Sequence, residues 1–201
     1  MNDHYYTENP NSAHDEREVT IRILGLELRF TTDAGTFSRD GLDRGTEVLL
    51  EALPPMTGHV LDLGCGWGAI GVSVARANPG CRVVMADVNR RALQLSRDNL
   101  ERNHTTAEVI ESDGMAQVLD RTFDAVITNP PIRAGKQVIY KMFADAAAHL
   151  NQGGALYLVI RKQQGAESCV KYLKTLFGQV EKLDKSGGFW VLKASEPLER
   201  N

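Results

Sequence analysis

The sequence predicts an α/β domain built on a doubly wound, mainly parallel sheet. Two observations carry this prediction: short apolar, β-branched runs alternate with amphipathic helical segments from residue 59 onward, and glycine or proline stands between most of them. Strands separated by helices at this spacing are typical of parallel sheets covered on both faces. At 201 residues, with 42% hydrophobic and 24% charged residues, the chain suits one soluble domain with a small addition.

Residues 1–55 are expected to lie outside this sheet. Residues 1–17 lack apolar periodicity and predict a loosely held arm. Residues 19–32 alternate apolar and polar side chains around Gly25, which predicts a hairpin with one apolar face. A glycine-rich loop at 33–45 then leads to a helix over 46–53, which ends at two prolines. The chain is therefore divided into an N-terminal region, 1–55, and a main domain, 56–201.

The main domain is expected to hold seven strands. The predicted strands span 59–63, 82–87, 107–112, 123–128, 155–160, 180–185 and 188–194, and the predicted helices span 68–78, 89–103, 136–150 and 166–177. Asn89 is placed to cap the second of these helices. The last two strands flank Gly187 and Gly188, so they predict a closing hairpin and one antiparallel edge strand at the end of the chain.

Composition excludes several classes of protein. No apolar run approaches the roughly 18 residues of a membrane span, and the polar, acidic first 18 residues resemble neither a secretory signal nor a transit peptide. Cys65, Cys81 and Cys169 are odd in number and lack CxxC spacing, which supports neither a disulfide framework nor a zinc site. We therefore expect a cytoplasmic protein without a metal or a membrane partner.

The net charge of −3 argues against a protein coated in nucleic-acid-binding charge. Its distribution is uneven: residues 1–55 carry 5 basic and 11 acidic side chains, whereas residues 132–201 carry 11 basic and 6 acidic ones. The basic C-terminal third is consistent both with an anion-binding face and with scattered, solvated lysines, and the sequence leaves the two open.

A glycine loop follows the first predicted strand of the main domain, in VLDLGCGWGAIGV. Glycines between a strand and a helix let a ligand approach the backbone closely, and the helix N–H groups point at it. Asp87 ends the next strand, where a carboxylate can accept hydrogen bonds from ribose hydroxyls. These features indicate a nucleoside and fit the relaxed dinucleotide fingerprint too, so a nicotinamide enzyme stays open. Asp62, just before the loop, favours S-adenosylmethionine, because an acid suits a ligand with a positive amino group.

In this order, VLDLGCGWG, Asp87, Asp113 and NPP resemble the class I S-adenosylmethionine-dependent methyltransferases over residues 59–195. More narrowly, DAGTFSRDGLDRGTEVLLEAL and NPPIRAGK resemble the ribosomal RNA guanine-N2 methyltransferases, in a short, single-domain branch that HYYTENP also matches. The resemblance implies a Rossmann-like fold, S-adenosylmethionine as cofactor, and small-subunit (16S) ribosomal RNA or the small ribosomal subunit as partner. Longer members carry an additional N-terminal domain that is expected to be missing here. The implied cofactor-binding residues are Phe37 in a loop over the cofactor, Asp62, Gly64, Cys65, Gly66, Gly68, Asp87, Val88, Asp113, Gly114 and Asn129.

The strand in FDAVITNPPIRAG ends at Asn129, Pro130 and Pro131, which we take as the catalytic residues. An exocyclic amine is a poor nucleophile because its lone pair is delocalised. Two acceptors, the side-chain oxygen of Asn129 and the carbonyl oxygen of Pro130, can hold its N–H bonds and aim the lone pair at a methyl donor. The prolines stiffen this geometry, so the chemistry is preorganisation and requires no metal or general base. Taken alone, the motif is also consistent with a simple strand-ending turn.

The substrate is expected to meet residues beyond the prolines. Many amino-methylating relatives have an aromatic residue where this chain has Ile132, so stacking on a flipped base would come from Phe37 or Arg133. The expected substrate-binding residues are Ile132, Arg133, Lys136, Arg161 and Lys162, with Gln164 reading a base edge.

The leading hypothesis is methyl transfer to guanine N2 in small-subunit ribosomal RNA by a monomeric enzyme. Methylation of adenine N6 or of a protein glutamine amide stays open, because each presents a flat NH2 group. A non-catalytic RNA-binding or ribosome-assembly factor that retains the fold is a third possibility.

Overall fold

The structure of the chain, a computed structural model, describes residues 13–199. The matching stretch HYYTENP and most of the expected N-terminal arm lie outside the described residues. The strands are β1 (Arg17–Ile23), β2 (Leu26–Thr32), β3 (Gly58–Leu63), β4 (Cys81–Asp87), β5 (Glu108–Glu111), β6 (Phe123–Thr128), β7 (Leu150–Arg161), β8 (Phe177–Ser186) and β9 (Phe189–Pro197). The helices are α1 (Arg44–Ala52), α2 (Ala69–Ala77), α3 (Arg90–Arg102), α4 (Lys136–Ala148) and α5 (Ala166–Leu173), with short 3₁₀ turns η1 (Ile132–Ala134) and η2 (Lys162–Gln164).

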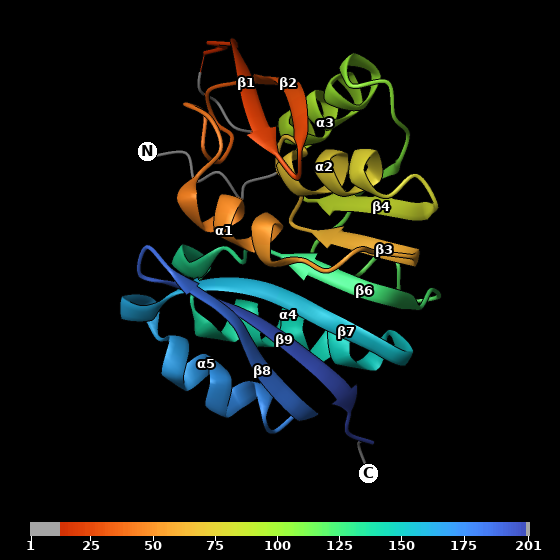
Figure 1. Cartoon of the computed structure of the whole chain (residues 1–201), viewed down its shortest axis with the longest axis vertical. Coiled ribbons are helices and arrows are strands. Elements are labelled where there is room, and N and C mark those ends of the chain that lie inside the picture. The colour runs from red at the N-terminus through yellow and green to blue at the C-terminus, as the bar shows by residue number, and fades with distance from the viewer. Residues whose placement is uncertain (1–12, 200–201) are drawn as a thin grey trace.

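The main sheet has seven strands in the order β5-β4-β3-β6-β7-β9-β8 (Figure 1). β3 pairs in parallel with β4 and β6, and β6 pairs in parallel with β7, whereas β9 is antiparallel to both of its neighbours. The predicted doubly wound, mainly parallel sheet with a terminal antiparallel strand is therefore confirmed. The expectation of an antiparallel strand at the edge is wrong, because β9 inserts between β7 and β8 and leaves β8 at the edge.

Alternate residues of the central strands enter two different apolar layers. Val60 of β3 belongs to one buried cluster with α1, α2 and α3, and its neighbour Leu61 belongs to a second cluster with α4 and α5. This follows from the two-residue period of a strand, which points successive side chains to opposite faces. Because both faces are covered, the central strands are mainly apolar, as is typical of parallel sheets.

β1 and β2 form a separate hairpin that α3 holds through two buried asparagines. The side chain of Asn99 accepts from the backbone N–H of Thr31 at 2.7 Å and donates to its carbonyl oxygen at 2.9 Å. Asn103 repeats this pattern with the backbone of Arg29, at 3.0 and 2.7 Å. Asn99 also donates to the carbonyl oxygen of Trp67, at 2.8 Å. The asparagines thus take the place of a neighbouring strand and tie the hairpin to the glycine loop.

Several predicted boundaries move. β7 begins at Leu150, five residues before the predicted strand, and it contains the glycines that were expected only to follow the helix before it. At Gly154 a Cβ atom would lie 3.0 Å from the carbonyl oxygens of both Asn151 and Phe123, so this glycine allows close backbone packing within the strand. α5 ends at Leu173 instead of 177, and Phe177 begins β8.

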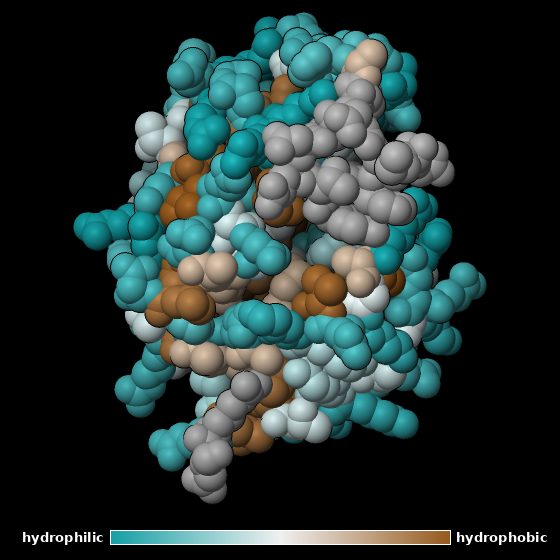
Figure 2. Space-filling model, turned by 180° about the vertical axis from the view of Figure 1, so that it is seen from behind, coloured by the Kyte–Doolittle hydropathy of each residue, from teal (hydrophilic) through white to brown (hydrophobic). Residues whose placement is uncertain are grey.

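The face of the molecule that is turned away from the viewer in Figure 1 is largely hydrophilic, with hydrophobic residues near its middle (Figure 2). None of the helices within residues 13–199 has the length and apolar character that crossing a lipid bilayer requires.

Candidate active site

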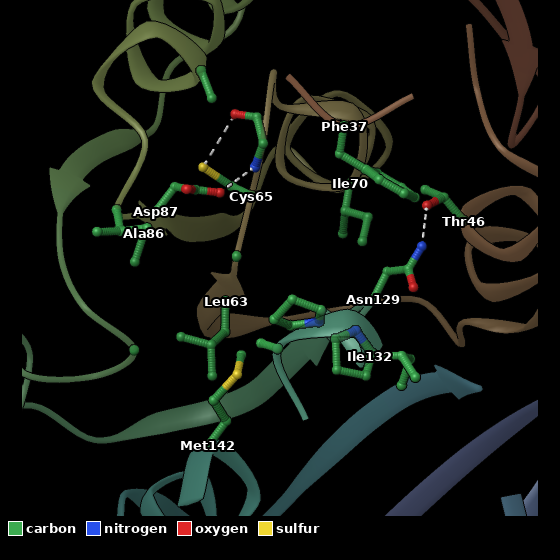
Figure 3. A pocket seen from close by; sticks show the side chains of 18 of the residues that line it. Phe37, Thr46, Leu63, Cys65, Ile70, Ala86, Asp87, Asn129, Ile132 and Met142 are labelled. Carbon is green, nitrogen blue, oxygen red and sulfur yellow. Dashed lines mark hydrogen bonds between the residues drawn. The ribbon is translucent and has the colours of Figure 1, made fainter. Parts of the chain in front are cut away.

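A cavity of about 830 Å³ opens where β3, β4, β5 and β6 end (Figure 3). In a parallel sheet these carboxyl ends meet at one edge, which is the usual place for a ligand. The loop between β2 and α1 forms the facing wall. The lining residues that the sequence predicted are Phe37, Gly64, Cys65, Gly66, Asp87, Val88, Asp113, Gly114, Asn129, Pro130, Pro131, Ile132, Arg133, Arg161 and Gln164.

The glycine loop presents bare backbone to this cavity. Gly64 and Gly66 have φ angles of 78° and 55°, and a Cβ atom on either would meet nothing within 4 Å. The N–H groups of Gly64 and Cys65 both donate to the carbonyl oxygen of Ala86, at 2.8 and 3.0 Å, which holds the loop against the end of β4. Open space on the cavity side of these glycines is what a closely approaching ligand needs.

Gly68 does not line the cavity, and its role is packing. It caps α2 with a φ of 96°, and a Cβ atom there would lie 2.9 Å from the methyl carbon of Met85 and 3.1 Å from the hydroxyl of Ser96. A glycine therefore lets α2 start close against β4 and α3.

Asp87 faces the cavity from the end of β4. One carboxylate oxygen accepts from the N–H of Gly66 at 2.7 Å and the other from the N–H of Asn89 at 2.9 Å. Burial raises the pKa of Asp87, and the hydrogen bonds from Asn89, Gly66 and Val88 oppose that rise. A carboxylate has about four acceptor positions, so Asp87 retains capacity for hydroxyl groups of a ligand.

Asp62 lies behind the glycine loop rather than on the cavity wall. It shares the α2 side of β3 with Val60, because strand side chains alternate, and one of its oxygens accepts from the N–H of Gly71 at 2.8 Å. Its other oxygen, Oδ1, has no hydrogen-bond partner among residues 13–199. Burial, and to a smaller extent the charge of Asp87, raises the pKa of Asp62 to about 7. Asp62 therefore lies outside the cavity lining, and its expected contact with a cofactor stays a prediction.

The loop between β2 and α1 is fastened to the glycine loop and to α3. The indole Nε1–H of Trp67 donates to the carbonyl oxygen of Phe37 at 2.7 Å. The side-chain amide of Asn89 donates to the carbonyl oxygen of Gly35 at 3.0 Å. Arg91 donates to the carbonyl oxygen of Ala34 at 2.7 Å. Phe37 remains 38% exposed, and its ring lies beside Ile70 on the cavity wall (Figure 3).

Asn129 ends β6 with its amide held by α1. Its Nδ2 donates to the hydroxyl of Thr46 at 2.9 Å and to Oδ1 of Asp43 at 3.3 Å, and its oxygen is turned away from Thr46 (Figure 3). Within residues 13–199, neither this oxygen nor the carbonyl oxygen of Pro130 accepts a hydrogen bond. Two acceptors of adjacent residues are thus available at the cavity wall.

The remaining lining combines apolar side chains with charged residues of both signs. Ile132 lies on the wall with Val138, which is 44% exposed. The guanidinium of Arg161 lies 5.3 Å from the ring centre of Phe189. Lys136 and Lys162 are exposed and do not line the cavity, so the structure separates them from the other expected substrate residues.

Sequence reasoning missed three residues that shape the site: Asp43, Thr46 and Trp67. Asp43 is the N-cap of α1 and accepts from the backbone N–H of Thr46 at 3.1 Å. An aspartate just before a helical run signals a helix start, but it gives no sign of a contact with Asn129. Trp67 stands inside the glycine loop, yet nothing local indicates that its N–H reaches Phe37.

Comparison with known proteins assigns this geometry to a family. The sequence matches the methyltransferase small domain over residues 27–193. It is 38% identical over 200 residues to the uncharacterized protein YbxB of Bacillus subtilis (strain 168), covering 98% of this chain and 100% of that one. It is 34% identical over 193 residues to ribosomal RNA small subunit methyltransferase C of Vibrio vulnificus (strain CMCP6), covering 92% of this chain and 55% of the relative.

A solved structure matches as well. The 16S rRNA N2 methyltransferase (RsmC) of T. thermophilus, in complex with AdoMet and guanosine, has a TM-score of 0.82 and 31% identity, covering 93% of this chain and 52% of that one. The chain spans about half the length of these two ribosomal RNA methyltransferases.

Proposed function

The chain belongs to the methyltransferase small domain family, and we propose that it transfers a methyl group from S-adenosylmethionine to the exocyclic N2 of a guanine in small-subunit ribosomal RNA. The relative from T. thermophilus, whose structure contains AdoMet and guanosine, supports both the donor and the acceptor. Since this chain covers about half of that relative, the RNA target is part of the proposal.

The cavity wall fits S-adenosylmethionine. The volume of about 830 Å³ lies within the roughly 300–1,000 Å³ typical of small-molecule sites. Gly64 and Gly66 offer open backbone to the amino acid part, Asp87 has free acceptor capacity for the ribose, and Asp113 lines the wall where an adenine amino group would be accepted. When bound, the cofactor supplies an electrophilic methyl group on a sulfonium.

One observation carries the proposed chemistry: the oxygen of Asn129 and the carbonyl oxygen of Pro130 line this cavity and accept no hydrogen bond from the part of the chain that the structure describes. They hold the two N–H bonds of a flat amino group and turn the nitrogen lone pair toward the methyl carbon. As the new N–C bond forms, the C–S bond breaks and its electron pair stays on sulfur. The nitrogen then loses one proton to water, so the chain's contribution is orientation and electrostatics.

The rest of the site is consistent with a base taken out of RNA. A base stacked in a helix cannot reach a buried methyl donor, so it must be unstacked or flipped. Ile132 and Val138 offer an apolar surface, Phe37 an exposed ring, and Arg133 and Arg161 positive charge for phosphates. We include in the proposal a monomeric, cytoplasmic enzyme that needs no metal and works on ribosomal RNA or the small subunit.

The test is transfer of a labelled methyl group from S-adenosylmethionine by the purified protein to small-subunit ribosomal RNA. We expect label that nuclease releases and protease does not, with N2-methylguanosine as the labelled nucleoside by mass spectrometry. Label in N6-methyladenosine, or label that only protease releases, would overturn the guanine assignment. Absence of calorimetric binding of S-adenosylmethionine or S-adenosylhomocysteine would overturn the proposal as a whole.

A further inference from the structure

We propose that Asp43 and Thr46 are positioning residues that fix which end of the Asn129 side-chain amide faces the substrate. The inference rests on the proposed function, because it concerns the acceptor that orients the reacting amine. It goes beyond that function because it assigns a role to the start of α1, which lies outside the strand ends that form the rest of the site.

The inference follows from what each group can donate and accept. The carboxylate of Asp43 can only accept hydrogen bonds, and a threonine hydroxyl has one proton to give. The hydroxyl of Thr46 gives that proton to Oδ2 of Asp43 at 2.5 Å. It can therefore only accept from Asn129, whose nitrogen lies 2.9 Å away. Both neighbours demand an NH2 group, so the amide oxygen must turn to the cavity.

The opposite orientation would be unfavourable on both sides. A flipped amide would set its oxygen against the Asp43 carboxylate and against the hydroxyl oxygen of Thr46, whose single proton is already given to Asp43. On the cavity side it would point N–H donors at the N–H donors of the substrate. Asp43 and Thr46 therefore decide whether Asn129 attracts or repels the amine.

These two side chains are themselves firmly held. Asp43 caps α1 through the backbone N–H of Thr46 at 3.1 Å, and Thr46 is buried. α1 is anchored by Val48, Leu49 and Leu50, which are fully buried against the sheet. The orientation of Asn129 at the end of β6 is thus set by a rigid element 83 to 86 residues earlier in the chain.

Thr46→Val and Thr46→Ser form the matched pair that tests this role. Valine keeps the shape and leaves the backbone N–H to Asp43, but it removes the hydroxyl. We expect Thr46→Val to lower kcat about 10-fold or more, as loss of one orienting hydrogen bond does, with the Kd for S-adenosylmethionine unchanged. Thr46→Ser should recover kcat to within about threefold, since it restores the hydroxyl. Asp43→Asn, which offers a competing donor, should lower kcat further.

A measurement independent of turnover separates this inference from the proposed function. The side-chain NH2 resonances of Asn129, assigned by their absence in Asn129→Ala, should move in Thr46→Val and stay near their wild-type positions in Thr46→Ser. If the wild type transfers no methyl group, the proposed function fails while the resonances still report the orientation. Wild-type kcat in both Thr46→Val and Asp43→Asn, or unmoved Asn129 resonances in Thr46→Val, would overturn the inference. Thermal melting of each variant shows whether a loss reflects unfolding instead.

Discussion

The two ends of the cavity are held by different kinds of contact. At the glycine end, Gly64 to Gly68 and Asp87, backbone N–H groups hold the carboxylate in place: Asp87 accepts from the N–H groups of Gly66 and Asn89. At the amide end, Asn129 and Pro130, the side-chain amide of Asn129 donates to Asp43 and Thr46 at the start of α1. One end is thus assembled locally and the other across the fold.

This difference predicts a division of labour. In the proposed mechanism the glycine end binds the parts of the cofactor that do not react, so changes there should alter cofactor affinity. The amide end is proposed to bind the reacting nitrogen, where an interaction that strengthens in the transition state raises kcat without tightening cofactor binding. Substitutions at the two ends should therefore separate affinity from turnover.

Asn129→Ala should show the largest effect. It removes one of the two acceptors for the amine, and loss of one such preorganised group lowers kcat by about 10²–10³-fold. The Kd for S-adenosylhomocysteine, measured by calorimetry, should stay near the wild-type value, because Asn129 uses its amide on Thr46 and Asp43. A large loss of cofactor affinity would break the division between the two ends. A cellular phenotype that survived Asn129→Ala would favour a non-catalytic role.

Asp62, buried behind the glycine end, should make folding stability depend on pH. Its pKa is raised to about 7 in the folded chain, against about 3.9 when unfolded, so the folded state binds the extra proton between these values. The contribution of Asp62 to the free energy of unfolding therefore falls as pH rises from about 4 to about 7, and it is constant above that range. Relative to Asp62→Asn, the wild type should lose roughly 2–3 kcal/mol of unfolding free energy between pH 5 and pH 8.

Urea denaturation of both proteins at the two pH values measures this difference. Asp87 and the histidines are common to both proteins, so their titration largely cancels in the comparison. A difference between the two proteins that does not change with pH would mean that Asp62 is ionised at low cost, and that its unpaired oxygen finds a partner.

Asp87→Ala should produce the converse of Asn129→Ala. The carboxylate is proposed to accept from the ribose hydroxyls, and hydrogen bonds to a charged group contribute about 1.5–3 kcal/mol each. We expect the Kd for S-adenosylhomocysteine to rise about 10- to 100-fold, while kcat at saturating cofactor changes far less. Since the variant also frees the N–H groups of Gly66 and Asn89, its melting temperature is the control. An unchanged Kd in a folded variant would remove Asp87 from the cofactor site.

The same contrast explains how far the sequence could be interpreted. Alternating strands and helices predict the sheet. The glycines after one strand and Asp87 at the end of the next predict the glycine end, because each signal is a short local pattern in the sequence. The contact of Asn129 with Thr46 joins residues 83 apart, and no local pattern indicates it. Asp62 was expected at the cofactor because an acid before the loop suits a positive amino group, and in the structure it is buried and accepts from the N–H of Gly71 in α2. This contact depends on how α2 packs against β3, which the local sequence does not indicate.

Ile132→Phe should give the smallest effect, and it tests how the amide end binds the base. Ile132 begins η1 and, like the exposed Val138, lines the cavity, so we expect a larger flat side chain there to extend over a flipped base. Aromatic stacking contributes about 0.5–1.5 kcal/mol beyond the area that it buries, so the KM for the RNA substrate should fall roughly two- to tenfold with kcat nearly unchanged. Ile132→Leu, of similar volume, is the matched control and should leave KM close to the wild-type value. A higher KM for Ile132→Phe alone would mean that the isoleucine is fitted to the base and that stacking comes from Phe37, whose ring lies across the same cavity.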